Sequence, residues 1–356
     1  MSAPSVAIVH DFLTIKGGSE RVALALTSAF PDAPLYTSLY KPDGTFAEFA
    51  DVDVRTGPLN RVPRFRNDHR LALPFLSPSF RATRIDADVV ICSSAGFSHH
   101  VRTTGAKVVY CHTPARWLYD ADRYVNGWSG LVGVGAAVMR PALAPLDRVA
   151  MAEASLIIAN SPDIAAEVER IYDREPIVIS PCSSLSLDGP VEPIANLEPG
   201  FILCPSRTLG YKRLDVLVDA ARMLPELQFL HIGDGPHRSS LADAPRNVRS
   251  VGSVDDARLR WAYRNARAVA ITCAEDFGLV PMEAHAHGLT SVVPRARGLI
   301  GQRALAESGI FYDYGRAEAL AKALVETEAP RSRALHPDRL GVDEFISAIA
   351  THAAAL

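Results

Sequence analysis

The stretch AVAITCAEDFGLVPMEAHAHG, residues 268–288, contains the local pattern on which the predicted fold rests. It opens with small apolar residues, as in a strand that is buried on both faces of a parallel sheet. A polar loop follows, and the next apolar stretch carries Pro281 in its first turn, where a helix tolerates proline because the amide there is unpaired. The stretch therefore predicts a strand, a loop and a helix in succession, the repeating unit of an α/β fold.

Further apolar, β-branched runs alternate with helical patterns along the chain. A first series lies at residues 5–10, 88–92, 107–111, 155–159 and 176–180. A second series lies at residues 201–204, 228–232, 248–251, 268–272 and 290–293. The helical patterns include residues 20–30, 164–172, 213–223 and 317–328. Two series of this kind predict two doubly wound domains, each a parallel sheet covered by helices.

Proline, glycine and serine crowd between the two series in PCSSLSLDGPVEPIANLEPG, residues 181–200, where the hydrophobic periodicity lapses. We expect an interdomain linker there, with a first domain over residues 1–180 and a second over residues 201–340. Residues 341–356 predict a C-terminal helix that packs back on the first domain. Since open parallel sheets bind ligands beyond the carboxyl ends of their strands, we expect a binding cleft between the domains.

Composition narrows the class of protein. The 356-residue chain is 48% hydrophobic and 22% charged, which suits two domains of about 150 residues each. Its net charge of -3 offers no general attraction for nucleic acid, so we expect no nucleic-acid partner. The five cysteines include no C-x-x-C pair, which argues against a structural zinc. With no signal-peptide pattern and no apolar run of about 20 residues, we expect a cytoplasmic protein.

Two loops of the second domain carry candidate binding residues. Residues 275–280 lead into a helix, whose N-terminal amides suit a phosphate or a sugar hydroxyl, with Glu275 before the first helical turn and Glu283 within that turn. In CPSRTLGYKRL, Arg207 and Lys212 follow a buried strand, where a diphosphate needs positive charge. The alternatives are that Glu283 only complements the helix dipole and that the other charged side chains are solvated.

The first domain offers two weaker signals. In VAIVHDFLTIKGGSER, the pair Gly17 and Gly18 lets the backbone approach a ligand closely, although a glycine pair is also typical of a simple turn. The segment lacks both the dinucleotide and the P-loop pattern. His112 follows the strand at residues 107–111 and would project into the cleft, with a purely structural histidine as the alternative.

A basic segment surrounds the apolar stretch at residues 71–80. It can rest on an anionic membrane or hold an acidic acceptor, with a solvated face as the alternative. The segment contains Arg61, Arg64, Arg66, His69, Arg70, Arg81 and Arg84.

The combination of these motifs resembles the retaining GT-B glycosyltransferases of family 4 (group 1). The glutamates of E-x7-E, the upstream basic pair and the Gly-Gly loop carry the resemblance, which IVHDFLTIKGGSERV, FPDAPLYTSLY, YCHTPARWLYD and IIANS extend over most of the first domain. It covers residues 6–293 and is closest to bacterial mannosyltransferases of surface-polysaccharide assembly. Two segments depart from the family pattern: residues 180–184, and residues 294–302, where Gln302 stands near the position of a usual glutamate.

The resemblance implies an α/β GT-B fold of two Rossmann-like domains, the first binding the acceptor and the second the nucleotide sugar. It implies a hexosyltransferase (EC 2.4.1.-), with GDP-mannose as the expected donor and a sugar, lipid-linked or small-molecule acceptor in polysaccharide, glycolipid or glycoconjugate biosynthesis. Transfer would retain the anomeric configuration without a metal or cofactor, since the nucleotide sugar is a co-substrate. From the lack of an export signal and from the basic segment Arg61 to Arg84, rather than from the resemblance, we expect a cytoplasmic enzyme with a peripheral contact at the inner face of the membrane as one interpretation of that segment.

The resemblance also assigns roles to residues. Arg207 and Lys212 would bind the diphosphate, Glu283 the ribose hydroxyls, and Glu275 the sugar hydroxyls near the anomeric carbon, with His112 on the opposite wall. The implied catalytic residues are Glu275, His112, Arg207 and Lys212. The implied donor-binding residues are Gly17, Gly18, Arg207, Lys212, Asp276, Phe277, Gly278, Leu279, Val280 and Glu283.

Three other functions stay open from the sequence. One is a glycosyltransferase of a secondary metabolite that uses another NDP-sugar. The others are a non-catalytic nucleotide-sugar-binding subunit, which the intact motifs argue against, and a two-domain nucleotide-sugar epimerase.

Overall fold

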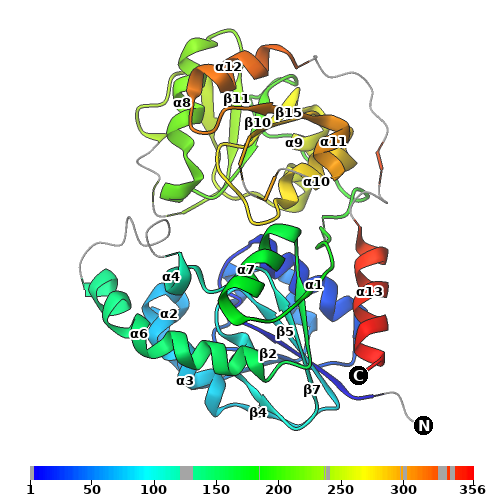
Figure 1. Ribbon diagram of the computed structural model, residues 1–356. Helices are drawn as coiled ribbons and strands as arrows, with labels where there is room; N and C mark the ends of the chain where they lie inside the picture. Colours follow the sequence, from blue (N-terminus) through cyan, green and yellow to red (C-terminus); the bar gives the residue numbers. More distant parts are fainter. Residues whose placement is uncertain are drawn as a thin grey trace. The chain divides into compact units, whose positions relative to one another are not determined.

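The computed structural model describes residues 4–120, 131–183, 185–235, 237, 241–296, 298–299, 303–327, 335–336 and 341–356. The chain forms two compact units (Figure 1). The first consists of Met1–Ser184 together with Val342–Leu356, and the second of Leu185–Gly341. The boundary between them falls within residues 181–200, where the hydrophobic periodicity lapses.

Within the described residues, the first unit has a parallel sheet in the order β3-β2-β1-β5-β7-β8-β9. Its strands are β1 (Val6–His10), β2 (Leu35–Thr37), β3 (Val54–Thr56), β5 (Val89–Ser94), β7 (Ala106–Cys111), β8 (Leu156–Ala159) and β9 (Ile177–Val178). A separate pair joins β4 (Arg84–Ile85) to β6 (Arg102–Thr103). The strand order reverses between β1 and β5, and such a switch point is where doubly wound sheets bind ligands.

Helices cover both faces of this sheet because its central strands alternate apolar residues toward two cores. One core lies under α3, α6 and α7, and the other under α1 and α13. The helices of the unit are α1 (Gly18–Ala29), α2 (Pro63–Asn67), α3 (Leu73–Ala82), α4 (Arg116–Tyr119), α6 (Leu131–Ala152), α7 (Pro162–Tyr172) and α13 (Val342–Ala354). Short 3-10 helices are η1 (Pro42–Gly44), η2 (Ala47–Asp51), η3 (Pro58–Arg61), η4 (His69–Ala72) and η5 (Ser98–His100).

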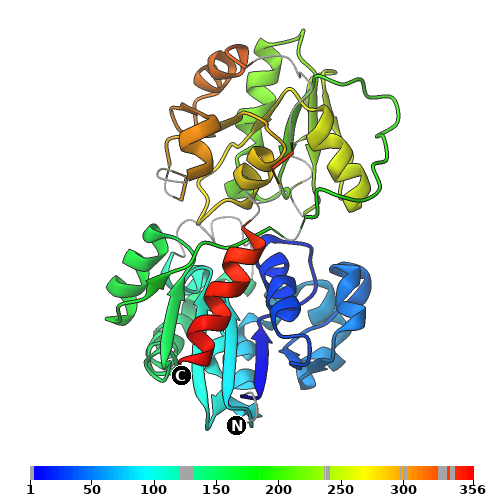
Figure 2. The same cartoon turned by 90° about the vertical axis from the view of Figure 1, so that its right-hand side faces the viewer.

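The C-terminal helix α13 is part of the first unit's core. Phe345 is fully buried, and its ring meets the ring of Tyr110 on β7 edge-on, with centroids 5.4 Å apart. Ile349 and Ala353 extend the same buried face. Figure 2 shows α13, in red, lying along the sheet beside α1.

The second unit repeats the architecture within the described residues, with a parallel sheet in the order β12-β11-β10-β13-β14-β15. Its strands are β10 (Ile202–Pro205), β11 (Phe229–Ile232), β12 (Val248–Ser250), β13 (Ala268–Ala270), β14 (Ser291–Pro294) and β15 (Gly309–Tyr312). The helices are η6 (Gly210–Lys212), α8 (Leu214–Met223), α9 (Asp256–Asn265), α10 (Leu279–Ala286), α11 (Arg303–Ser308) and α12 (Ala317–Val325). Its switch point lies between β10 and β13.

The predicted pair of doubly wound, Rossmann-like domains is confirmed. Strands β2, β3 and β15 are not predicted from the sequence. β2 and β3 are only three residues long, and β3 is mostly exposed at a sheet edge, so neither forms a long apolar run. β15 is a four-residue apolar strand at the edge of the second sheet. In the part of the chain that the structure describes, no helix is long and apolar enough to cross a membrane.

Candidate functional site

An ion pair joins the two loops that leave the switch point of the second unit. Lys212, at the end of η6, places its Nζ atom 2.5 Å from Oε1 of Glu275, which follows β13. The Cys273 thiol donates to the same oxygen at 3.1 Å, and the Thr272 hydroxyl donates to the Lys212 carbonyl at 2.6 Å. The two loops are therefore fixed together at the edge where a doubly wound sheet binds ligands.

The ion pair keeps Lys212 charged. Burial by itself would lower the pKa of Lys212, but the Glu275 carboxylate beside it raises that pKa well above its usual value. The two side chains are only 14% and 21% exposed, so water screens their interaction weakly. An ammonium group has three N–H donors, and within the described residues only the one toward Glu275 has an acceptor. The remaining donors are available to an anion.

Arg207 lies in the loop after β10, which packs backbone to backbone against the loop after β11. A Cβ atom on Gly233 would lie 2.2 Å from the Ser206 carbonyl oxygen, and one on Gly235 would lie 2.5 Å from that of Thr208. Glycine is therefore required at both positions for the loops to approach this closely. Among the described side chains, the half-buried Arg207 guanidinium has no ion-pair partner.

Glu283 is a buried carboxylate held by a tyrosine. Gly278, with a φ of 83°, caps the N-terminus of α10, and Glu283 is the fifth residue of that helix. The Tyr263 hydroxyl donates to Glu283 Oε2 at 2.6 Å, and the Tyr263 ring stacks on His287, which donates to the Glu283 carbonyl. Because Glu283 lies beyond the first turn, its placement within that turn was wrong, and the helix-dipole alternative does not hold.

The residues between Glu275 and Pro281 are half-buried and form the end of the loop and the start of α10. They are Asp276, Phe277, Gly278, Leu279 and Val280. Their loop is supported by Gly298, a residue that the sequence pattern does not single out. A Cβ atom there would lie 1.6 Å from the Glu275 carbonyl oxygen, and the φ of 77° also favours glycine. Arg297 and Gln302, beside it in sequence, lie outside the described residues.

In the first unit, His112 follows β7 and is buried. Its Nε2 atom lies 2.8 Å from the Ser93 hydroxyl, and burial lowers the pKa of His112 to about 3. Gly17 and Gly18 begin α1, but the space at Gly17 is filled by the chain itself, since a Cβ atom there would lie 2.5 Å from Glu20 Oε2. The buried Glu20 was missed because an acidic residue in a first helical turn is ordinary.

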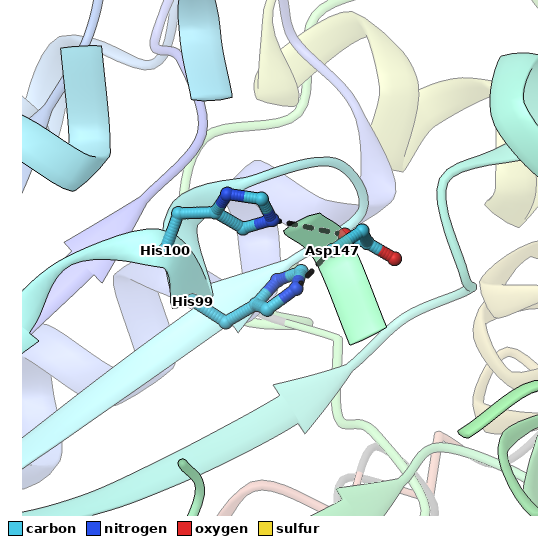
Figure 3. A group of neighbouring side chains, drawn as sticks. All are labelled: His99, His100 and Asp147. Atoms are coloured by element: carbon cyan, nitrogen blue, oxygen red, sulfur yellow. Dashed lines mark hydrogen bonds and ion pairs between the residues drawn. The ribbon is translucent and has the colours of Figure 1, made fainter. Parts of the chain in front are cut away.

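Among the described residues, His99, His100 and Asp147 form a group that could hold a metal ion (Figure 3). Each imidazole Nε2 lies 3.0 Å from Oδ1 of Asp147, and the hydroxyls of Tyr119 and Tyr172 donate to Oδ2 at 2.8 Å. Burial lowers the pKa of His100 to about 4. Two imidazoles and two phenol groups thus surround the two carboxylate oxygens, and the group ties η5 to α6.

The basic segment at residues 61–84 combines exposed arginines with exposed apolar side chains. Asp68 pairs with Arg70, and Glu153 pairs with Arg81, so part of the charge is neutralised. Arg61, Arg64 and Arg84 are exposed. The exposed apolar side chains are Val62, Leu71 and Phe75.

Two family models match the chain. Residues 16–183 match a model described as Glycosyltransferase Family 4, and residues 200–328 match one described as Glycosyl transferases group 1. No curated protein matches the chain significantly.

Solved structures of similar fold cover nearly the whole chain. Anabaena Alr3699/HepE in complex with UDP and glucose has a TM-score of 0.68 at 17% identity, covering 99% of this chain and 100% of that one. The chain is a GT-B glycosyltransferase. This glycosyltransferase is also similar to sucrose-phosphate synthase from Thermosynechococcus elongatus, with a TM-score of 0.64, 18% identity and coverage of 99% and 96%. WaaG, a glycosyltransferase involved in lipopolysaccharide biosynthesis, has a TM-score of 0.59 at 17% identity, covering 98% of this chain and 94% of that one.

Replacement of Gly298 by alanine tests the support of the Glu275 loop. Gly315→Ala is the matched control, because its φ of 75° is nearly the same but its Cβ would lie 3.4 Å from Arg213 Nη1. In both variants the strained backbone conformation should lower the free energy of unfolding by about 1 to 3 kcal/mol. The clash should make Gly298→Ala clearly less stable in urea denaturation, and equal losses in the two variants would contradict the close approach.

Proposed function

We propose that this glycosyltransferase moves a hexose from a nucleotide sugar to an acceptor hydroxyl, with retention of the anomeric configuration and with GDP-mannose as donor. The Lys212–Glu275 pair at the switch point of the second unit carries the proposal. The resemblance of the E-x7-E and Gly-Gly motifs to bacterial mannosyltransferases supports the choice of mannose.

The leaving diphosphate gains negative charge as the sugar–phosphate bond breaks, so the site must supply positive charge there. Arg207 and Lys212 follow β10, and two N–H donors of Lys212 have no hydrogen-bond acceptor in the described part of the chain. These cations bind the diphosphate, and the proposed transfer therefore requires neither a metal nor a cofactor.

The two glutamates hold hydroxyl groups of the donor. Glu283 is positioned by Tyr263 and accepts from the ribose hydroxyls. Glu275 and the amides of Phe277, Gly278 and Leu279 hold the sugar near its anomeric carbon, where an oxocarbenium-like state develops. The acceptor hydroxyl attacks on the face that the diphosphate leaves, and a phosphate oxygen takes its proton, which accounts for retention.

The first unit binds the acceptor in this proposal, while Gly17 and Gly18 approach the donor phosphates and His112 contacts the donor sugar. The acceptor is a sugar, a lipid-linked sugar or a small molecule. A second donor is UDP-glucose, because the Alr3699/HepE structures hold UDP or UDP-glucose. AviGT4, a glycosyltransferase involved in avilamycin A biosynthesis, has a solved structure similar to this chain with a TM-score of 0.56. That similarity supports the alternative of a secondary metabolite as acceptor.

We propose that the enzyme works in the cytoplasm at the inner face of the membrane and that the basic segment at residues 61–84 makes the contact. Exposed arginines attract anionic lipid headgroups, and exposed Leu71 and Phe75 enter the headgroup region.

A panel of nucleoside diphosphates tests the donor. GDP should raise the melting temperature more than UDP, ADP or dTDP, because only the folded enzyme binds it. Transfer from GDP-mannose, followed by NMR of the product before it equilibrates, should give the anomeric configuration of the donor. Stabilisation by UDP or dTDP alone would rule out GDP-mannose, and an inverted product would rule out retention.

Replacement of Lys212 by methionine tests the diphosphate site. We expect kcat to fall by about 100-fold or more, since a preorganised donor to the developing charge is lost. Lys322→Met, on the exposed face of α12, removes the same charge from the same unit and should leave kcat unchanged. Transfer at the wild-type rate by Lys212→Met, or by Glu275→Ala, would contradict the assigned site.

Sedimentation with lipid vesicles tests the membrane contact. The double variant Leu71→Ser/Phe75→Ser should bind vesicles containing phosphatidylglycerol about tenfold less tightly, because its apolar insertion is lost. Met223→Ser/Val325→Ser is the control, as those side chains are similarly exposed on the second unit. Equal binding by both variants would contradict the proposed contact.

A further inference from the structure

Four buried polar side chains form a continuous chain at the carboxyl edge of the first sheet. Glu20 lies on α1, His10 ends β1, Ser93 lies near the end of β5, and His112 follows β7. His10 Nε2 lies 3.6 Å from Glu20 Oε1, and His10 Nδ1 lies 3.0 Å from the Ser93 hydroxyl oxygen. The same hydroxyl lies 2.8 Å from His112 Nε2. The chain thus crosses the switch point of this sheet and ends on a proposed donor-sugar contact.

The arrangement follows from strand alternation. Residues His10, Ser93 and His112 continue the strand faces that carry Ile8, Ile91 and Tyr110 in the core under α1. Ser94 points to the opposite face, where its hydroxyl lies 2.9 Å from His99 Nδ1 in the group around Asp147. Two neighbouring serines therefore serve two separate histidine networks.

The single proton of the Ser93 hydroxyl couples the two histidines. If Ser93 donates to His10, it must accept from His112, and if it donates to His112, it must accept from His10. Burial lowers the pKa of His112 to about 3, so its ring stays neutral and carries one proton. The proton position on His112 is consequently fixed by the proton position on His10.

Glu20 selects between these two states. Its Oε1 atom and His10 Nε2 are both buried and face each other at 3.6 Å, and neither has a hydrogen-bond partner among the described residues. On a neutral His10 ring, which carries a single proton, a carboxylate facing Nε2 favours that proton on Nε2 over Nδ1. In that state Nδ1 of His10 accepts from Ser93, Ser93 accepts from Nε2–H of His112, and Nδ1 of His112 is left as an acceptor.

The Glu20 carboxylate occupies space that a side chain at residue 17 would need, since a Cβ atom on Gly17 would lie 2.5 Å from Oε2 of Glu20. The backbone of His112 is fixed as well: its amide donates to the Ser94 carbonyl at 2.8 Å, and the Asn160 side chain donates to its carbonyl at 2.9 Å. Both ends of the buried chain are therefore held in place, which is what a relay of proton positions requires.

We propose that Glu20, His10 and Ser93 are positioning residues that hold His112 with an unprotonated Nδ1, which accepts a hydrogen bond from a hydroxyl of the donor sugar. This rests on the proposed function, because it names what His112 recognises in the donor. A site built to accept a hydroxyl discriminates against the deoxy sugar, which leaves that acceptor unpaired. The enzyme should therefore select donors that carry a hydroxyl at this position.

Nitrogen-15 NMR of the histidine rings tests the proton positions without any substrate. The signals of His112 are assigned by their loss in His112→Gln. In the wild-type enzyme we expect its Nε2 to be protonated and its Nδ1 to be unprotonated, and the reverse result would overturn the proposal. In Glu20→Met, which has a side chain of similar size and no charge, the proton should move to Nδ1 of His112.

Ser94→Ala is the matched control, because it removes a buried serine–histidine bond from the adjacent position without touching the relay. It should leave the His112 signals unchanged, whereas Ser93→Ala should make them independent of residue 20. An unchanged His112 proton position in Glu20→Met would overturn the proposal. If Glu20→Met does not fold, the proton positions of His112 in the wild-type enzyme still decide it.

Kinetics then link the proton position to the donor. We expect Glu20→Met to lower kcat/KM by about tenfold with the intact donor and to lose most of the discrimination against deoxy donors. If Glu20→Met discriminated against deoxy donors as strongly as the wild-type enzyme, the proposed hydrogen bond between His112 and the donor sugar would be overturned. Absence of transfer from every donor would contradict the proposed function instead, and it would leave the NMR result on the relay standing.

Discussion

The ion pair between Lys212 and Glu275 is the interaction on which the site of the second unit depends. It joins loops from neighbouring strands that are 63 residues apart in sequence, so neither loop can move alone. Taking an ammonium or a carboxylate out of water singly is expensive, and pairing offsets that cost. An anion entering the site meets a cation whose charge is already compensated. Arg207, which has no ion-pair partner among the described side chains, and the amides before α10 therefore contribute much of the net attraction.

The same site depends on backbone packing that only glycine permits. Gly298 lies against the Glu275 carbonyl, and Gly233 and Gly235 lie against the loop of Arg207. In the first unit, Gly17 leaves room for the Glu20 carboxylate. In both units, a main-chain carbonyl or a carboxylate thus occupies the space beside a glycine that a larger residue's side chain would fill. Rigid supports of this kind preorganise a site, because the groups do not have to be ordered when a ligand binds.

Sequence patterns predict the parts of this structure that depend on local chemistry. Long buried strands form apolar runs that can be recognised in the sequence, and so can the loops that follow them. For this reason Lys212 and Glu275 were both predicted to follow strand ends. Their direct contact was not predictable, because it depends on β10 and β13 being neighbours. Glu20 and Gly298 escaped notice for the same reason: each is ordinary in its own segment and is explained only by a residue distant in sequence or fold.

The return of α13 to the first unit affects how the chain is made. Phe345, Ile349 and Ala353 fill a core whose other buried members come from the first 182 residues, and the whole second unit is synthesised between them. Domains generally fold as units during synthesis. On the ribosome, the second unit can therefore be complete while the sheet of the first still exposes the apolar surface that α13 later covers. During that interval the nascent first unit is the part of the chain whose exposed apolar surface favours aggregation.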